Sequence, residues 1–150
     1  MTAKPSVLII EARYYTEIAD NLLAGAIRVL EGAGIDFETI TVPGALELPA
    51  ALSMAIGGRP GADRFEGYVL LGCVIRGETS HYDVVVNQSA RGTMDLVVKH
   101  GLALGFGILT VENQEQAIIR SRVDKLDKGG EAARAALTLI DLRQRFQAAP

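Results

Sequence analysis

A short polar run, RGETSHYD, follows the apolar run YVLLGCVI and combines several reactive groups. Within residues 76–83 it has a guanidinium at Arg76, hydroxyls at Thr79 and Ser80, and an imidazole at His81. An imidazole with an ordinary pKa near ~6.5 accepts and releases protons at neutral pH, so His81 is a candidate proton carrier. The alternative is a loop that precedes a helix and exposes a solvated histidine, and residue types alone leave both interpretations open.

The same turn is suited to binding an anion. Gly77, Glu78 and Thr79 present backbone N–H groups close to the expected start of a helix. Such donors, together with the helix dipole, commonly bind phosphate or carboxylate groups. The turn is therefore a candidate anion site beside His81.

Several other chemistries lack their sequence motifs. No G-x-G-x-x-G follows the first apolar run and no G-x-x-x-x-G-K-[ST] is present, so dinucleotide binding and P-loop chemistry have no support. G-x-S-x-G is also absent, and Ser80 and His81, as sequence neighbours, are poorly placed to act as nucleophile and base. Two histidines and one cysteine make a poor set of ligands, so we expect no metal site.

The elements that would position these groups alternate along the chain. Four short runs are typical of parallel strands, at residues 7–10, 37–42, 68–75 and 107–111. We expect these apolar runs to be buried on both faces of a sheet. Between them, one amphipathic segment keeps an apolar face from Ile18 to Leu30, and a second helix is expected over 83–104. This order predicts an α/β fold: a three-layer α/β/α sandwich with a four-stranded parallel sheet.

In such sheets, ligands bind beyond the carboxyl ends of the strands. Each expected strand of this chain is followed there by unusual residues, at positions 12–15, 42–48, 76–81 and 110–113. We therefore expect the functional site at this edge of the sheet.

Length and composition limit the class of protein. With 150 residues, 49% of them hydrophobic, the chain is expected to form one domain over residues 1–150 with a substantial core. The net charge of -3 and the lack of a basic run argue against nucleic acid as a partner. No apolar stretch reaches the ~18 to 20 residues needed to cross a bilayer, so no membrane partner is expected. Cys73 alone permits no internal disulfide and fits a cytoplasmic location.

Five segments that span nearly the whole chain resemble those of a known family. In order, they are EARYYTEIADNLLAGA, VPGALELP, GCVIRGETSHYD, GFGILTVENQEQAIIR and DKGGEAA. Their order and spacing resemble the lumazine synthase family. The details of EARYY, VIRGETSHYD and DKGGEAARAAL are most similar to its alphaproteobacterial branch.

The resemblance implies a flavodoxin-like fold and a step of riboflavin biosynthesis. The enzyme would be a transferase that condenses 5-amino-6-(D-ribitylamino)uracil with 3,4-dihydroxy-2-butanone 4-phosphate, with no cofactor and no metal. The products would be 6,7-dimethyl-8-ribityllumazine, phosphate and water. The resemblance also implies a homopentamer with active sites between neighbouring subunits.

The resemblance assigns residues to the pyrimidine and its ribityl chain. Tyr14 would stack on the pyrimidine ring, and Phe106 would reach it from the adjacent subunit. The other implied contacts are Ala45, Leu46 and Glu47 for the ribityl chain, and Cys73, Val74 and Ile75 for the pyrimidine. The alternatives are that Tyr14 packs under its own loop, that Glu47 serves the helix dipole, and that Cys73 is a small buried hydrophobe. Many relatives have asparagine where this chain has Tyr15.

The resemblance also assigns the phosphate and the proton transfers. Glu78 and Thr79 match a phosphate-binding turn, and Arg120 matches an arginine whose planar fork suits phosphate oxygens. Lys128 matches a further basic residue near the site, and its alternative is a surface lysine in the first turn of a helix. His81 would be the catalytic residue.

The helix expected over 83–104 favours an oligomer. Its apolar residues fill an arc broader than one sheet can cover, so part of the arc should meet another subunit. The resemblance implies that this partner is the next copy in a five-membered ring. Residues 122–127, RVDKLD, lack the glycines that shell-forming relatives carry there, so they should take left-handed backbone angles less readily. We therefore expect an isolated pentamer.

Two other functions compete with this prediction. One is a flavin- or lumazine-binding protein with little turnover on the same scaffold, against which the presence of His81 and Arg120 argues. The other is a receiver-type signalling domain, since sheet order alone allows it. A receiver would need an acidic cluster after the first strand, and Glu11 and Asp20 are too far apart in sequence to be a convincing one.

Overall fold

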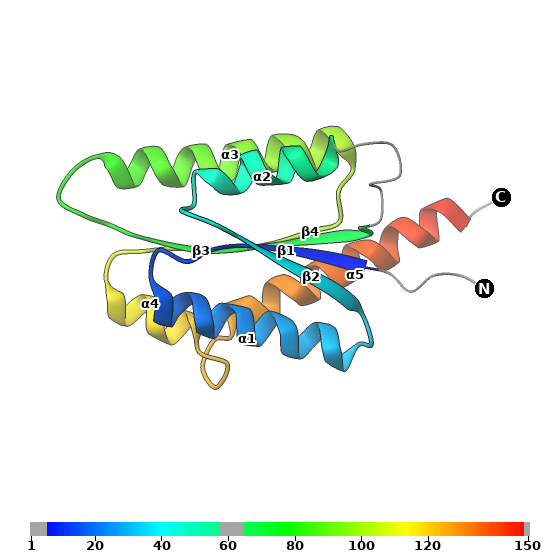
Figure 1. Ribbon diagram of the computed structural model, residues 1–150, viewed down its shortest axis with the longest axis horizontal. Helices are drawn as coiled ribbons and strands as arrows, with labels where there is room; N and C mark the ends of the chain where they lie inside the picture. Colours follow the sequence, from blue (N-terminus) through cyan, green and yellow to red (C-terminus); the bar gives the residue numbers. More distant parts are fainter. Residues whose placement is uncertain (1–5, 58–64, 149–150) are drawn as a thin grey trace.

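The computed structural model describes residues 6–57 and 65–148 and contains a four-stranded parallel sheet. The strands are β1 (Ser6–Ala12), β2 (Asp36–Val42), β3 (Gly67–Ile75) and β4 (Leu104–Val111), in the order β2-β1-β3-β4. All pairings are parallel, so every strand's carboxyl end points to the left in Figure 1. This order is that of flavodoxin-like sheets, which confirms the predicted fold class.

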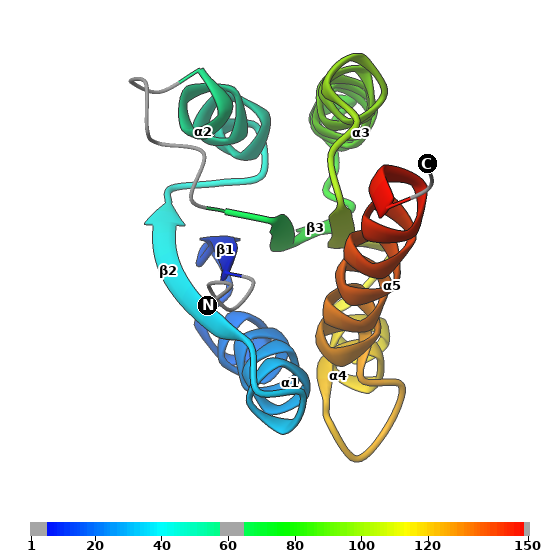
Figure 2. The same ribbon diagram turned by 90° about the vertical axis from the view of Figure 1, so that its right-hand side faces the viewer.

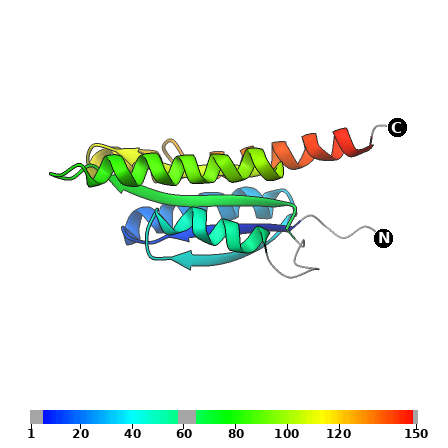
Figure 3. The ribbon, with the colours of Figure 1, turned by 90° about the horizontal axis from the view of Figure 1, so that it is seen from above.

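Helices cover both faces of the sheet. They are α1 (Thr16–Gly32), α2 (Glu47–Ile56), α3 (His81–His100), α4 (Gln114–Ser121) and α5 (Lys128–Ala148). Figure 2 shows α1, α4 and α5 on one face and α2 with α3 on the other, and Figure 3 shows the α2–α3 layer from above. In the described part of the chain, no helix is long and apolar enough to cross a membrane.

The central strands are buried on both faces, as predicted. In β1, Val7 and Ile9 pack into the core beneath α1 and α5, while Leu8 and Ile10 pack into the core beneath α2. Because successive side chains of a strand point to opposite faces, this arrangement explains the continuous apolar run. The same prediction is wrong for β2, where residues 38–41 are exposed. β2 lies at the edge of the sheet, so it has a neighbouring strand on one side only.

The boundary between α3 and β4 differs from the prediction. The helix expected over 83–104 begins at His81 and ends at His100, and Leu104 is already the first residue of β4. Gly101 ends the helix in a left-handed conformation with φ 62° and donates its N–H to the Val97 carbonyl. Glycine takes this conformation without the penalty that a Cβ atom would cause.

Two glycines bring α5 close to its neighbours. A Cβ atom at Gly129 would clash with the backbone oxygen of Leu22 in α1, and one at Gly105 would clash with the backbone oxygen of Ala132. The absence of a side chain at both positions therefore lets α5 pack tightly between α1 and β4.

The linker before α5 adopts a left-handed backbone angle at one residue, although it lacks glycine. Asp127 has φ 46°, so this linker does adopt a left-handed angle without glycine. Aspartate is enriched among the non-glycine residues that take this conformation. Its side chain also accepts a hydrogen bond from the Gly130 N–H at 3.2 Å, which caps α5.

Candidate active site

A pocket of about 440 Å³ lies beyond the carboxyl ends of β1, β2 and β3. It is lined by residues after β1, residues after β2, the end of β3 and the start of α3: Tyr14, Tyr15, Pro43, Gly44, Ala45, Leu46, Glu47, Cys73, Val74, Ile75, Gly77, Thr79, His81, Tyr82 and Val85. Its position at this edge of the sheet is the one predicted from the order of the elements.

Most of the predicted site residues meet in this pocket. They are Tyr14, Ala45, Leu46, Glu47, Cys73, Val74, Ile75, Thr79 and His81. Glu78 belongs to the same turn as Thr79, but its exposed side chain is not part of the lining. The pocket thus brings together predicted residues that are up to 67 positions apart in the sequence, from Tyr14 to His81.

Tyr14 projects from a loop that hydrogen bonds and ion pairs hold in place. It is 75% exposed and therefore does not pack under its own loop. The buried Glu11 carboxylate accepts hydrogen bonds from Arg13 at 2.6 Å and from the Thr41 hydroxyl at 2.9 Å, and Arg13 also pairs with Asp20. These contacts tie the loop after β1 to β2 and to the first turns of α1.

The end of β3 forms an apolar wall. Val74 is buried and Cys73 is half-buried. Burial raises the pKa of the Cys73 thiol to about 12, so the thiol stays protonated at neutral pH. A protonated, buried thiol packs as a small hydrophobe and is a poor nucleophile.

Glu47 is the first residue of α2 and faces the pocket from the β2 side. Its carboxylate folds back over Gly44, where an added Cβ atom would lie 3.3 Å from Oε1. The helix dipole favours a carboxylate at this position, and the side chain remains exposed. It can therefore accept hydrogen bonds from a ligand without first losing a buried partner.

The start of α3 supplies the polar end of the pocket. Ser80 occupies the N-cap position, but its side chain makes no capping hydrogen bond. The His81 N–H donates to the Thr79 hydroxyl at 3.3 Å, and the His81 side chain is exposed. Backbone donors at the start of a 20-residue helix are well suited to an anionic group.

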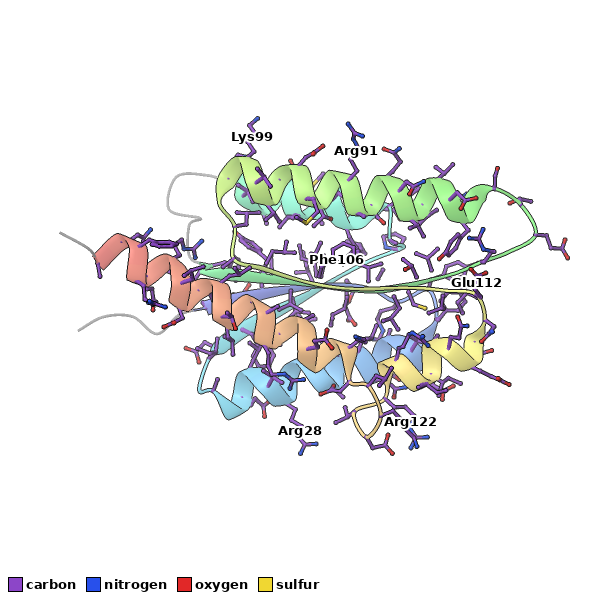
Figure 4. All side chains as sticks on the ribbon, turned by 180° about the vertical axis from the view of Figure 1, so that it is seen from behind. Arg28, Arg91, Lys99, Phe106, Glu112 and Arg122 are labelled. Carbon is purple, nitrogen blue, oxygen red and sulfur yellow. The ribbon has the colours of Figure 1, made fainter. Side chains whose placement is uncertain are left out.

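Arg76 connects the end of β3 with α3 and with the end of β4. Its guanidinium donates to Glu112 at 2.8 Å, lies 3.5 Å from Asp83, and stacks 4.2 Å above the centre of the Tyr82 ring. Figure 4 shows Glu112 at the end of the sheet where α3 begins. Arg76 therefore holds the polar turn between β3 and α3 against the end of β4.

The remaining predicted residues line a second pocket of about 290 Å³. Phe106, labelled on β4 in Figure 4, lines it together with Arg120 at the end of α4 and Lys128 at the start of α5. Arg120 is half-buried and donates to the Gln116 carbonyl at 3.2 Å, and Lys128 pairs with Glu131 at 3.1 Å. One chain thus divides the predicted site residues between two separate pockets.

Sequence reasoning missed several lining residues. Tyr15 and Tyr82 are each adjacent to a predicted residue, and Val85 lies one helical turn after His81. Helical spacing of three or four residues from His81 is the signal that identifies Val85. In the described ranges, no three His, Cys, Asp or Glu side chains are grouped so that they would hold a metal ion.

Comparison with known proteins identifies the family. A sequence model of the 6,7-dimethyl-8-ribityllumazine synthase family matches residues 4–144. The chain is 57% identical over 143 residues to 6,7-dimethyl-8-ribityllumazine synthase 1 of Rhizobium meliloti (strain 1021), covering 95% of this chain and 94% of that protein. It is 55% identical to the synthase of Agrobacterium fabrum, covering 96% and 98%, and 54% identical to that of Bartonella tribocorum, covering 97% and 95%. These matches agree with the predicted alphaproteobacterial branch, and the chain belongs to the 6,7-dimethyl-8-ribityllumazine synthase family.

Proposed function

We propose that this chain, as one domain, catalyses a condensation step of riboflavin biosynthesis. The substrates are 5-amino-6-(D-ribitylamino)uracil and 3,4-dihydroxy-2-butanone 4-phosphate, and the products are 6,7-dimethyl-8-ribityllumazine, phosphate and water. The observation that carries the proposal is the pocket that combines the exposed ring of Tyr14, the carboxylate of Glu47, the end of β3 and the imidazole of His81.

Each wall of the pocket has a role in binding the pyrimidine substrate. A flat heterocycle would stack on the Tyr14 ring and lie against Cys73–Ile75. There, backbone groups can form hydrogen bonds with the N–H and C=O groups on the edge of the heterocycle. The ribityl chain would extend toward α2, where Ala45 and Leu46 provide surface and Glu47 accepts hydrogen bonds from hydroxyls.

The phosphate of the second substrate is assigned to the turn before α3. Glu78 and Thr79 would act through their backbone N–H groups, supported by the helix dipole. The described lining of this pocket contains no arginine or lysine. Arg120, with Lys128 as a further candidate, supplies the positive charge in our proposal, and both line the second pocket.

The reaction needs proton transfers more than a strong nucleophile. An amine of the pyrimidine attacks the ketone, and the resulting carbinolamine loses water to give an imine. Phosphate then leaves by elimination, and the second amine closes the ring with loss of another water. His81 carries protons in these steps, and holding both substrates together supplies much of the acceleration.

The proposed assembly is a homopentamer in the cytoplasm, with each site formed by the first pocket of one copy and the second pocket of its neighbour. Two observations support it. Phe106, Arg120 and Lys128 lie apart from the first pocket. On α3, Met94 and Val98 are 48% and 77% exposed, so an apolar surface is available to another subunit. Repeated head-to-tail contacts close into a ring when the rotation per step permits.

The proposal is tested by mixing the purified protein with both substrates and following the lumazine chromophore and free phosphate. We expect both to appear in equal amounts, with turnover that does not change after treatment with EDTA. Binding of the pyrimidine without turnover would favour a storage protein on the same scaffold. A requirement for added metal would contradict the proposed chemistry.

A further inference from the structure

The loop after β1 carries two consecutive tyrosines, and only Tyr14 has a role in the reaction proposed above. Tyr15 lines the same pocket, but it is half-buried where Tyr14 is exposed. It occupies the N-cap position of α1 with extended backbone angles, φ -107° and ψ 101°, and its side chain makes no capping hydrogen bond. The Tyr15 side chain therefore does not serve as a helix cap, and its place in the pocket indicates a different role.

Tyr15 contacts both walls of the pyrimidine pocket. On one side, its ring meets the Tyr14 ring edge-to-face, with 4.9 Å between the ring centres and an angle of 76° between the planes. On the other side, the Tyr15 hydroxyl lies beside the backbone of Ile75 and the Cys73 thiol, and all three residues line the pocket. A single side chain therefore spans from the loop after β1 to the end of β3.

The sheet leaves a place for this hydroxyl. The pairing of β1 with β3 ends at Glu11 and Leu71, whereas β3 continues to Ile75. The Arg76 N–H donates to the Val111 carbonyl, so the backbone N–H of Arg76 points toward β4. The backbone N–H of the preceding residue, Ile75, therefore points to the opposite side, where β1 lies. On that side the β1 partner has already ended, which leaves room for the Tyr15 hydroxyl beside the Ile75 backbone.

We infer that Tyr15 is a positioning residue for the pyrimidine substrate, because it fixes the Tyr14 ring relative to the backbone of Cys73–Ile75. A heterocycle stacked on Tyr14 and read by the end of β3 needs both surfaces in a constant relative position. Tyr14 is 75% exposed, so its ring would otherwise lose conformational freedom when the ligand binds. A brace that orders the ring in advance lowers this cost and increases affinity. The identity of the ligand rests on the proposed function.

A purely structural role for Tyr15 predicts different results. Its ring also packs against the core beneath α1 and α5, so its removal will lower stability in either case. A structural role would leave pyrimidine affinity unchanged in any variant that remains folded. A positioning role requires a selective loss of affinity for the pyrimidine, with little effect on the phosphorylated ketone.

The test uses Tyr15→Phe, which keeps the ring and removes the hydroxyl, and Tyr15→Leu, which removes the aromatic contact as well. Equilibrium titration with 5-amino-6-(D-ribitylamino)uracil should show affinity about 3- to 10-fold weaker for Tyr15→Phe, as expected when one polar contact of the brace is lost. The loss for Tyr15→Leu should be larger. The KM for the phosphorylated ketone should stay within about twofold of wild type. Tyr68→Phe is the matched control, since it removes a hydroxyl at the opposite end of β3 and should not change pyrimidine affinity.

Thermal melting shows which variants are folded, and Tyr15→Phe decides the question if Tyr15→Leu is too unstable. Equal affinity of wild type and Tyr15→Phe would overturn the inference, and so would equal weakening of both substrates. The titration needs no turnover, so it separates the two proposals. Wild type that binds the pyrimidine without forming product would contradict the proposed function alone. Wild type that does not bind the pyrimidine would contradict both.

Discussion

His81 is the residue on which the proposed chemistry depends most. It is exposed at the first position of α3, where it can reach both a bound ligand and solvent. Loss of a proton carrier should leave the contribution of proximity intact. His81→Ala should therefore lower turnover by about 10- to 1,000-fold without changing the assembly.

Steady-state kinetics and light scattering on the same samples check this prediction. His100→Ala is the matched control, because His100 is also exposed but lies at the far end of α3. It should turn over like wild type. Turnover of His81→Ala close to that of wild type would show that another group, or solvent, transfers the protons.

Cys73 should be chemically inert in the folded protein. Burial raises the pKa of its thiol to about 12, and the thiolate is the reactive form. Iodoacetamide labelling at pH 8 should therefore be at least about 100-fold slower in the native protein than in urea, where the thiol regains an ordinary pKa near ~8.5. Native labelling should accelerate only as the pH approaches 12. Rapid labelling of the native protein at pH 8 would contradict the burial of this thiol.

At the scale of elements, the cap of α5 positions Lys128 at the second pocket. Asp127 combines a left-handed backbone with a side-chain hydrogen bond to the Gly130 N–H. Asp127→Ala loses the cap and leaves a Cβ-bearing residue in a disfavoured conformation, so the free energy of unfolding should fall by about 1 to 3 kcal/mol. Urea unfolding measures this change.

Asp127→Asn is the matched control, because asparagine also caps helices and tolerates a left-handed backbone. Its free energy of unfolding should stay close to that of wild type. The ion pair of Asp127 with Arg134, at 3.8 Å, would be lost in both variants and contributes little at the surface. If both variants were equally destabilised, that ion pair and not the cap would be the stabilising contact.

The central strands could be predicted from sequence, but the edges and ends of elements could not. The run 68–75 is apolar because helices cover both faces of β3, so composition alone marks it as a buried strand. β2 is exposed because it lies at the edge of the sheet. The sequence of a short apolar strand does not show whether the strand will be central or at an edge. Leu102 and Leu104 continue the apolar pattern of α3 past its last residue, which hid the break at Gly101.

The candidate site was predictable to different degrees. The pocket edge followed from the alternation of strands and helices, and the individual residues followed from the family resemblance. For Tyr15, the sequence showed only that a tyrosine stands where many relatives have asparagine. Its role depends on where β1 ends relative to β3, and strand register is a tertiary property that a single sequence does not encode locally.

At the scale of the whole molecule, the predicted state is an isolated pentamer. Light scattering should report about five chain masses. Val98→Glu places a charge on the exposed apolar surface of α3 and should break the ring into smaller species. Lys99→Glu is the matched control and should leave the ring intact, because Lys99 is exposed and points away from the sheet in Figure 4. A particle of about sixty chains would refute the isolated pentamer, and a monomeric wild type would refute the shared site as well.

The central claim is that one active site is built from the first pocket of one copy and the second pocket of the next. His81→Ala and Arg120→Ala damage different pockets, so each protein alone should be impaired at every site. If equal amounts are unfolded and refolded together, about one site in four should combine an intact His81 with an intact Arg120 in a head-to-tail ring.

The decisive measurement is the rate of lumazine formation by this mixed sample at limiting phosphorylated ketone. A shared site predicts about a quarter of the wild-type rate, well above either parent variant. A rate equal to the mean of the two parents, in rings shown to contain both chains, would mean that each subunit carries a complete site.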